Sequence, residues 1–400
     1  MQTPIHRTLT AVLLVIAVAA SACNSDDSPA VAPATTDTST STTATGGDDA
    51  EPASGAENEL EDALATIVVE TGVPALGAAV FDHDGLLDQG VAGLRQRDGL
   101  KAVTIDDVFH LGSNTKAMTA ALLARIGEQN GPVGFDTTLA EAFGDVTSVH
   151  SDYSTVTLEQ LLSHTGGAPN DDDLDIDESV LNLPVTEARA LASQLIVSEA
   201  PAETPGTVSA YSNSGYVIVA GAIETATGQT WEELMISEIF TPLEMDSCGF
   251  GPPGTDGTVD QPLGHDPSTG QPVYFDNPAV IAPAGGVHCS MADWGRFLVE
   301  ILNGLNGESS FLAQASVERL LEPAAAPVKG FDGGSALGWL VAEGPEGTAY
   351  FHNGSNTAWF SQATIVPAID RVVISVTNEA STGEHAGNLA FAALAEFYPA

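Results

Sequence analysis

Apolar side chains recur at helical spacing in several stretches of the chain. In residues 59–71, Leu60, Leu64 and Ile67 fall on one face, and Gly72 follows as a stop signal. Further helices are predicted at 116–128, 157–163, 187–197, 215–227, 231–239 and 389–398. Helices therefore dominate the middle of the sequence.

Strand-like apolar runs lie near both ends of the folded part. The runs 75–81 and 86–92 flank Asp82-His83-Asp84-Gly85 and predict a hairpin. Four more runs, at 337–341, 348–352, 361–366 and 372–376, follow each other through short turns, which favours antiparallel pairing. We expect an α/β fold of the α+β type. The two ends of the chain share one antiparallel sheet, flanked by the N- and C-terminal helices, with a helical insert region beside it.

The first 58 residues have a different composition. Arg7 precedes an apolar run at 11–20 that is too short to span a bilayer, which is typical of a signal peptide over residues 1–22. Its end resembles the bacterial lipobox, in which Cys23 is lipidated; the alternative is an ordinary cleavage site with Cys23 as a bystander. Residues 23–58 are poor in large apolar side chains and predict a disordered, lipid-anchored linker. The folded domain is expected at 59–400.

The charge of the chain excludes several partners. The formal net charge is −43, and residues 59–400 alone carry 47 acidic and 10 basic side chains. Such a chain cannot neutralise phosphates, so nucleic acid and anionic membrane surfaces are excluded, and membrane contact is expected only through the lipid anchor. The acidity is consistent with a saline habitat, but it identifies no ligand.

Several catalytic motifs are absent. No serine has Gly at both −2 and +2, and the chain contains no His-Glu-x-x-His, no Cys-x-x-Cys and no Gly-Lys-Ser/Thr. The carboxylate-rich stretch 171–178 lacks the glycine and the spacing of a calcium loop, and is interpreted as a solvated loop rather than a calcium site. No metal and no organic cofactor is expected.

One of the three lysines follows a serine at helical spacing. Ser113 and Lys116 lie three residues apart at the start of the predicted helix, and therefore on one face of its first turn. A serine hydroxyl becomes a nucleophile when a base takes its proton, and a lysine can do so if desolvation and the helix N-terminus lower its pKa. Ser-x-x-Lys also occurs by chance, so this motif alone does not establish catalysis.

Two downstream segments extend the pattern. Tyr211-Ser212-Asn213 precedes a predicted helix, and His352-Asn353-Gly354-Ser355 ends a predicted strand. In this order the three elements resemble the signature motifs of the serine penicillin-recognising enzymes, and in particular the class C β-lactamase-like branch with its D-Ala-D-Ala carboxypeptidases, esterases and β-lactamases. The resemblance extends over nearly all of 59–400 and includes 161–167, 239–245 and 283–286.

The resemblance implies a role for each motif residue. Ser113 is expected to be the acylated nucleophile, with Lys116 and Tyr211 sharing general acid and base work. Asn213 would bind the substrate amide or Lys116, and the backbone N–H groups of Ser113 and Ser355 would form an oxyanion hole. Four residues of the third element, His352, Asn353, Gly354 and Ser355, are expected to bind substrate. His352 stands where many members have Lys, and Asn353 where Thr is frequent, so recognition of a free carboxylate is in doubt.

Other notable residues have structural interpretations. His110 and His164 flank the motifs and are expected to be structural hydrogen-bonding groups. Trp339 is expected in the core and Trp359 in a pocket wall. Cys248 and Cys289 are the two thiols of the folded part; export would allow a disulfide, and two buried free thiols are the alternative.

The sequence thus predicts an exported serine hydrolase that acts on ester or amide bonds through an acyl-enzyme. Its expected substrate is a small molecule or a peptidoglycan peptide. The rival hypothesis is a catalytically inactive, cell-wall-binding lipoprotein of the same fold.

Overall fold

A large antiparallel sheet forms one half of the molecule. The computed structural model describes residues 57–170 and 178–399. Its seven strands have the order β2-β1-β12-β11-β10-β9-β8. They span Gly85–Gly93, Ala75–Asp82, Arg371–Thr377, Phe360–Val366, Gly347–Ser355, Leu340–Gly344 and Gly334–Ser335 in that order. All pairs are antiparallel, and β1 from the N-terminal part lies beside β12 from the C-terminal part. The predicted shared sheet is therefore confirmed.

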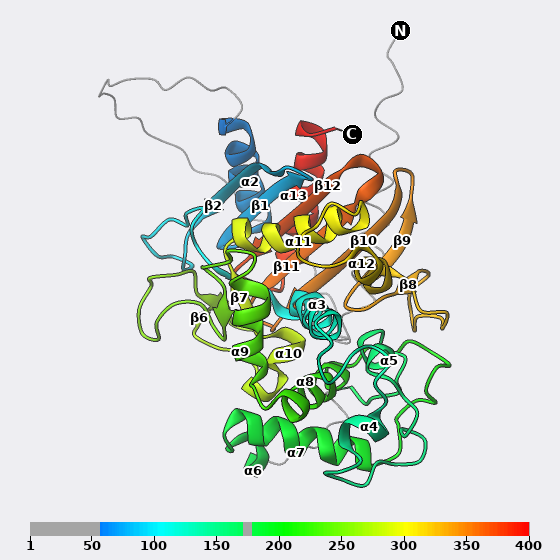
Figure 1. The fold of residues 1–400 in the computed structure, drawn as a ribbon. Coiled ribbons are helices and arrows are strands. Elements are labelled where there is room, and N and C mark those ends of the chain that lie inside the picture. Colours follow the sequence, from blue (N-terminus) through cyan, green and yellow to red (C-terminus); the bar gives the residue numbers. More distant parts are fainter. Residues whose placement is uncertain (1–56, 171–177, 400) are drawn as a thin grey trace, which may run out of the picture.

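Helices cover both faces of this sheet. α2 (Glu57–Thr71) and α13 (Gly383–Phe397) pack side by side on one face, and α11 (Met291–Leu305) packs on the other (Figure 1). Successive residues of a strand point to opposite faces. Leu76, Ala78 and Val80 of β1 accordingly join the cluster under α2 and α13, and Ala79 and Phe81 join the larger core under α11.

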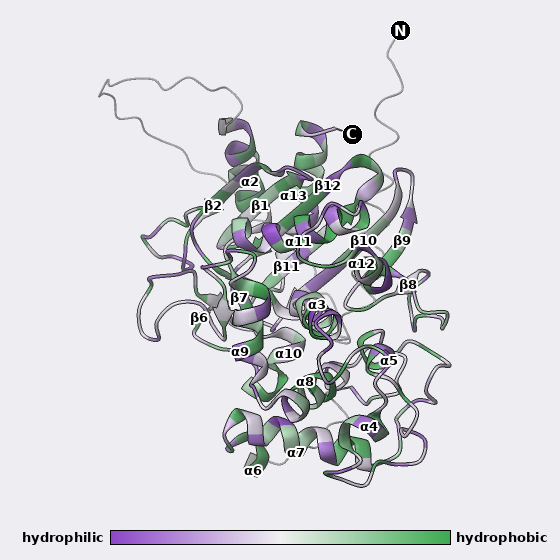
Figure 2. Cartoon of the chain, viewed as in Figure 1, coloured by the Kyte–Doolittle hydropathy of each residue, from purple (hydrophilic) through white to green (hydrophobic). Residues whose placement is uncertain are grey.

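Burial on both faces explains the composition of the central strands. β1 and β11 are buried almost throughout, and β1 and β12 are mostly hydrophobic in Figure 2, whereas the edge strand β2 includes exposed and hydrophilic residues. Such continuous apolar runs are expected for strands that are covered on both sides.

A helical region lies beside the sheet. It includes α3 (Thr115–Glu128), α4 (Leu139–Phe143), α5 (Leu158–Leu162), α6 (Glu178–Leu181), α7 (Val185–Ser198), α8 (Asn213–Thr227), α9 (Trp231–Met235) and α10 (Ala282–Gly285). A π-helical turn, Ile236–Phe240, follows α9, and α12 (Gln314–Leu321) packs against α11. Two small sheets complete the fold. They are β3-β7-β4 (Phe109–His110, Val287–Cys289, Gly249–Phe250) and β5-β6 (Gly264–His265, Pro272–Val273).

Some sequence predictions need correction. The strand predicted at 337–341 begins only at Leu340, because Gly338 has φ +84° and packs against the backbone of α3 at Ala117. The last helix begins at Gly383 rather than at 389, because its first turns carry small residues that the apolar pattern does not mark. Gly387 is one of these, and a Cβ atom there would lie 2.6 Å from the Oγ atom of Ser375 in β12. Helix α11 was not predicted.

None of the helices within residues 57–170 and 178–399 combines the length and the hydrophobicity that a membrane span requires. The proposed signal peptide and Cys23 lie outside the described residues, and so does the linker except for its last two residues, Glu57 and Asn58, which begin α2. The carboxylate-rich stretch 171–178 lies outside them too, except for its last residue, which begins α6.

Candidate active site

Ser113 lies on a tight turn between β3 and α3. In Figure 1, α3 lies at the junction of the sheet and the helical region. The turn Gly112–Asn114 is a 3₁₀ helix, and Gly112 has φ +49°, a conformation that favours glycine. Asn114 Nδ2 donates to Ser361 Oγ at 2.8 Å, and Ser361 Oγ donates to the Leu111 carbonyl at 2.7 Å. Strand β11 thus fixes the turn, and Ser113 remains partly exposed.

Lys116 is fully buried one turn further along α3. Its Nζ atom lies 3.1 Å from Ser113 Oγ, 2.6 Å from Asn213 Oδ1 and 2.8 Å from the Ala284 carbonyl oxygen. These three partners come from three separate elements, the 3₁₀ turn before α3, α8 and α10. A buried ammonium group needs such partners, because an unpaired charge is strongly disfavoured away from water.

Tyr211 completes the contacts of the serine. Its hydroxyl lies 2.7 Å from Ser113 Oγ, and the Lys116 Nζ atom lies 4.7 Å from the centre of its ring. Ser212 then caps α8 by accepting the Gly215 N–H at 3.1 Å. This cap starts the helix at Asn213, and so places the Tyr211 and Asn213 side chains beside Lys116.

Two histidines near these groups are neutral. Burial, together with the Lys116 charge, lowers the pKa of His352 to about 3 and holds the pKa of His164 well below its usual range. His164 Nδ1 accepts the Ser212 N–H at 3.1 Å, which agrees with the structural role expected for it. His352 Nδ1 lies 2.5 Å from the Asn353 carbonyl oxygen and must donate to it, so Nε2 is unprotonated.

Tyr216 also faces the lysine, but it is held by another partner. Its hydroxyl donates to the Leu162 carbonyl at 2.6 Å, and burial raises its pKa well above the ordinary value. Tyr216 is thus a wall of the site, and Tyr211 is the tyrosine in contact with Ser113.

Strand β10 brings the third sequence element against the serine turn. A Cβ atom on Gly112 would overlap the Ser355 backbone nitrogen, and one on Gly354 would lie 2.9 Å from the Ser113 nitrogen. Only glycines allow this approach, which brings the backbones at Ser113 and Ser355 together. His352 is buried toward the lysine, and Asn353, on the opposite face of the strand, is partly exposed.

The structure therefore brings together the residues of all three predicted elements. The sequence interpretation missed the Ala284 carbonyl as an acceptor for Lys116, because a backbone contact between α10 and α3 leaves no side-chain signal. It was wrong about Trp359, which is 1% exposed and packs edge-on against Phe109 with ring centres 6.1 Å apart. Trp359 belongs to the core because it follows the turn after β10 and points inward.

Cys248 and Cys289 are joined by a disulfide in the structure, across 41 positions of sequence. Cys289 lies in β7, opposite Phe109 of β3. The bond therefore supports the small sheet from which the serine turn emerges.

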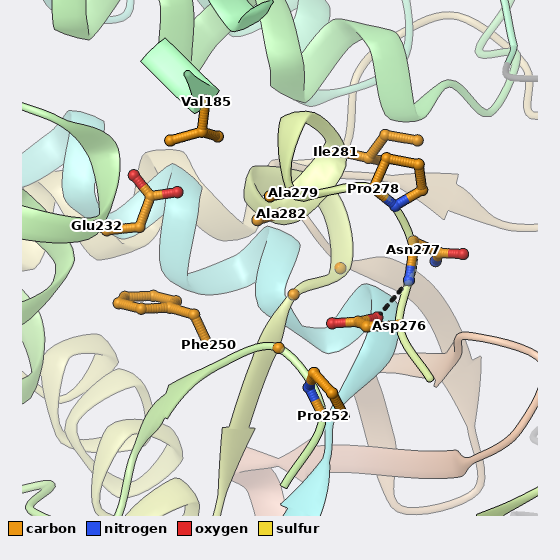
Figure 3. A pocket seen from close by; sticks show the side chains of 13 residues that line it. Val185, Glu232, Phe250, Pro252, Asp276, Asn277, Pro278, Ala279, Ile281 and Ala282 are labelled. Carbon is orange, nitrogen blue, oxygen red and sulfur yellow. Dashed lines mark hydrogen bonds between the residues drawn. The ribbon is translucent and has the colours of Figure 1, made fainter. Parts of the chain in front are cut away.

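A cavity of about 370 Å³ borders α10 on the side of Phe250 and Glu232 (Figure 3). Its wall includes Gly285, whose Cβ position would lie 3.7 Å from the Ser113 nitrogen, and the acidic side chain of Asp276.

A serine hydroxyl in contact with a buried lysine and a tyrosine, on a helix beside an antiparallel sheet, defines a serine hydrolase with a Ser-x-x-Lys motif. The family model described as Beta-lactamase matches residues 58–397, and the chain belongs to this family.

Individual relatives agree with this assignment. The chain is 30% identical over 345 residues to penicillin-binding protein 4 of Amycolatopsis lactamdurans, which covers 80% of this chain and 84% of that protein. The octameric penicillin-binding protein homologue from Pyrococcus abyssi has a similar structure, with a TM-score of 0.70 at 20% identity over 85% of this chain and 77% of that one. The D-amino acid amidase from Ochrobactrum anthropi SV3 has a TM-score of 0.67 at 19% identity, over 86% and 99% of the two chains.

Proposed function

We propose that this chain hydrolyses ester or amide bonds through an acyl-enzyme on Ser113. The observation that carries the proposal is the double contact of Ser113 Oγ, at 3.1 Å from Lys116 Nζ and 2.7 Å from Tyr211 OH. Both groups are within the distance that proton transfer needs.

In the acylation step, a neutral Lys116 would act as base. A neutral amine has two N–H groups and one lone pair. The two N–H groups would donate to Asn213 Oδ1 and the Ala284 carbonyl, which leaves the lone pair facing the Ser113 hydroxyl. Ser113 Oγ attacks the carbonyl carbon while its proton moves to Nζ, and the carbonyl oxygen becomes an oxyanion near the Ser113 and Ser355 N–H groups.

Collapse of this intermediate breaks the bond to the leaving group. Tyr211 would give its proton to the leaving oxygen or nitrogen and recover one from the Lys116 ammonium group. A water molecule then attacks the acyl-enzyme by the reverse sequence and releases the acid. Protons and charges balance over the cycle.

The third element favours substrates without a carboxylate next to the scissile bond. A buried anion needs a cation or strong donors opposite it. His352 is neutral because its pKa is about 3, and Asn353 offers an uncharged amide. The net charge of −43 also repels anions at low salt.

Steady-state kinetics at two ionic strengths test this preference. We expect a higher kcat/KM for uncharged short-chain p-nitrophenyl esters than for penicillins or a chromogenic cephalosporin. Raising the salt concentration should reduce the difference in kcat/KM between the two substrate classes, because salt screens the repulsion between the acidic protein and the anionic substrates. Faster β-lactam hydrolysis at low salt would contradict the proposed pocket.

Export and lipid anchoring at Cys23 are part of the proposal. The apolar run at 11–20 and the low-complexity composition up to residue 58 support them. Mass spectrometry of the mature N-terminus, with Cys23→Ser as the control, would test them. An unmodified Cys23 in the mature protein would rule out the anchor.

A further inference from the structure

Asp276 lies in the loop before α10, and its carboxylate accepts three hydrogen bonds. Oδ2 lies 3.0 Å from His110 Nε2, while Oδ1 accepts from Asn356 Nδ2 at 3.1 Å and from the Asn277 N–H at 2.7 Å. Figure 3 shows this side chain on the cavity wall, with its bond to Asn277. The Asp276 side chain is only 11% exposed, and its bonds to His110 and Asn356 are partly buried, whereas the bond from the Asn277 N–H is exposed.

One arm of this network reaches the serine turn. His110 is fully buried in β3, and its Nδ1 atom accepts the Gly112 N–H at 3.1 Å. That bond requires an unprotonated Nδ1, and a proton on Nε2 then points at Asp276. The Asp276 carboxylate therefore selects the histidine tautomer that can hold Gly112, the residue before Ser113.

The other arm reaches the end of β10. Asn356 directly follows Ser355, is 1% exposed, and accepts the Ala358 N–H with its Oδ1 atom at 3.3 Å. Its amide nitrogen is held by Asp276. A single carboxylate thus connects the two backbone segments that meet at Gly112 and Ser355.

We propose that Asp276, through His110 and Asn356, is a positioning residue that sets the backbone N–H groups of Ser113 and Ser355 for the oxyanion. The inference rests on the proposed acyl-enzyme function. Asp276 and His110 touch no reacting atom of the proposed reaction. Both act through the backbone of the serine turn and of β10. Misplacement of such donors by a fraction of an ångström weakens them chiefly in the transition state, where the charge develops.

The variant Asp276→Asn tests this role with almost no change of volume. An amide cannot accept a hydrogen bond from all three donors. Its NH₂ group, which cannot accept, must face either His110 Nε2 or the Asn356 and Asn277 donors. We expect kcat for an uncharged ester to fall about 10- to 100-fold with KM little changed. The affinity for a boronic acid, whose tetrahedral adduct places an oxygen in the oxyanion position, should fall by a similar factor.

Asp370→Asn provides the matched control. Asp370, in the turn between β11 and β12, also accepts a hydrogen bond from a histidine. Its partner is His83 on the β1–β2 hairpin, away from Ser113, and the distance between His83 Nδ1 and Asp370 Oδ2 is 2.6 Å. Its kcat should equal that of the wild type. His110→Asn, whose Oδ1 can still accept the Gly112 N–H, should retain more activity than His110→Leu.

Nitrogen NMR of His110 gives a readout that needs no activity. We expect an unprotonated Nδ1 and a protonated Nε2 in the wild type, and a loss of this preference in Asp276→Asn. A protonated Nδ1 in the wild type, or an unchanged kcat and boronate affinity in Asp276→Asn, would overturn the inference. Failure of the proposed function is a different result, because the wild type itself would then turn over no ester.

Discussion

The Nζ atom of Lys116 lies 3.1 Å from the Oγ atom of Ser113, although the lysine side chain is completely buried. The other acceptors of Nζ are Asn213 Oδ1 and the Ala284 carbonyl oxygen. The 3₁₀ turn with Ser113 and the first turn of α3 with Lys116 set the spacing of serine and lysine, whereas α8 and α10 provide these two acceptors. The reactive pair is therefore assembled by the packing of three helices and not by its motif alone.

Replacing the lysine tests its role as base. Lys116→Ala should lower kcat/KM for an ester by about 10²- to 10⁴-fold, because it removes the group that accepts the serine proton. Circular dichroism should show a folded protein. Lys329→Ala is the control, since this lysine is exposed and pairs only with Glu203 in the described part of the chain. Near wild-type acylation by folded Lys116→Ala would refute the assignment.

Tyr211 can be tested by removing one atom. Tyr211→Phe keeps the ring over Lys116 but loses the hydroxyl at 2.7 Å from Ser113, so turnover should fall by about 10²-fold or more while the melting temperature stays close to that of the wild type. Tyr398→Phe, which loses a hydroxyl bonded to Asp88 far from Ser113, should leave the kinetics unchanged. Equal kinetics in both variants would exclude Tyr211 from proton transfer.

The sequence predicted the sheet and the three motif segments well because each has a local signature. Periodic apolar positions marked most strands and helices, and Ser113, Lys116, Tyr211 and Asn213 stand at fixed spacings. Even α11, which was missed, carries Trp294, Phe297, Leu298 and Ile301 at helical spacing, and this signal could have revealed it.

Contacts between distant segments could not be predicted in this way. The Ala284 carbonyl and the Asp276 carboxylate reach the serine turn across more than 150 positions of sequence, and nothing in their local sequence indicates their partners. Trp359 was misplaced for a related reason, since an aromatic residue after a strand can face either a pocket or the core. Tertiary packing decides between these two outcomes.

The disulfide should contribute measurably to stability. Cys248→Ala/Cys289→Ala should lower the free energy of unfolding by about 3 to 4 kcal/mol, because the bond closes a loop in the unfolded chain. Wild-type protein with a reductant should show the same loss, and the double variant should not respond to the reductant. Titration of the denatured, unreduced wild type should find no reactive thiol in the domain; two thiols per chain would refute the bond.

The buried His352 predicts a pH dependence of stability. Its pKa is about 3 in the folded protein and near 6.5 in an unfolded chain, so between these values the unfolded state binds more protons. Stability should therefore fall as the pH decreases from 6.5 toward 3, by up to about 1.4 kcal/mol per pH unit from this group. The pKa of His164 is also lowered in the folded protein, so this residue should likewise make the stability fall as the pH decreases.

His352→Gln should remove that contribution. We would measure the free energy of unfolding of both proteins with urea between pH 6.5 and 4. Its slope against pH should be smaller in the variant, by an amount that corresponds to about one bound proton. Identical slopes would show that His352 titrates normally in the folded protein.

Intact-mass spectrometry after incubation with a fluorophosphonate tests the central claim most directly. We predict one adduct per chain, mapped to Ser113 by peptide sequencing, none in Ser113→Ala, and strongly slowed labelling in Lys116→Ala. A fluorescent penicillin provides a second probe of the same serine. No adduct with either reagent, together with no turnover of p-nitrophenyl esters, would contradict the account and favour an inactive cell-wall-binding protein of the same fold.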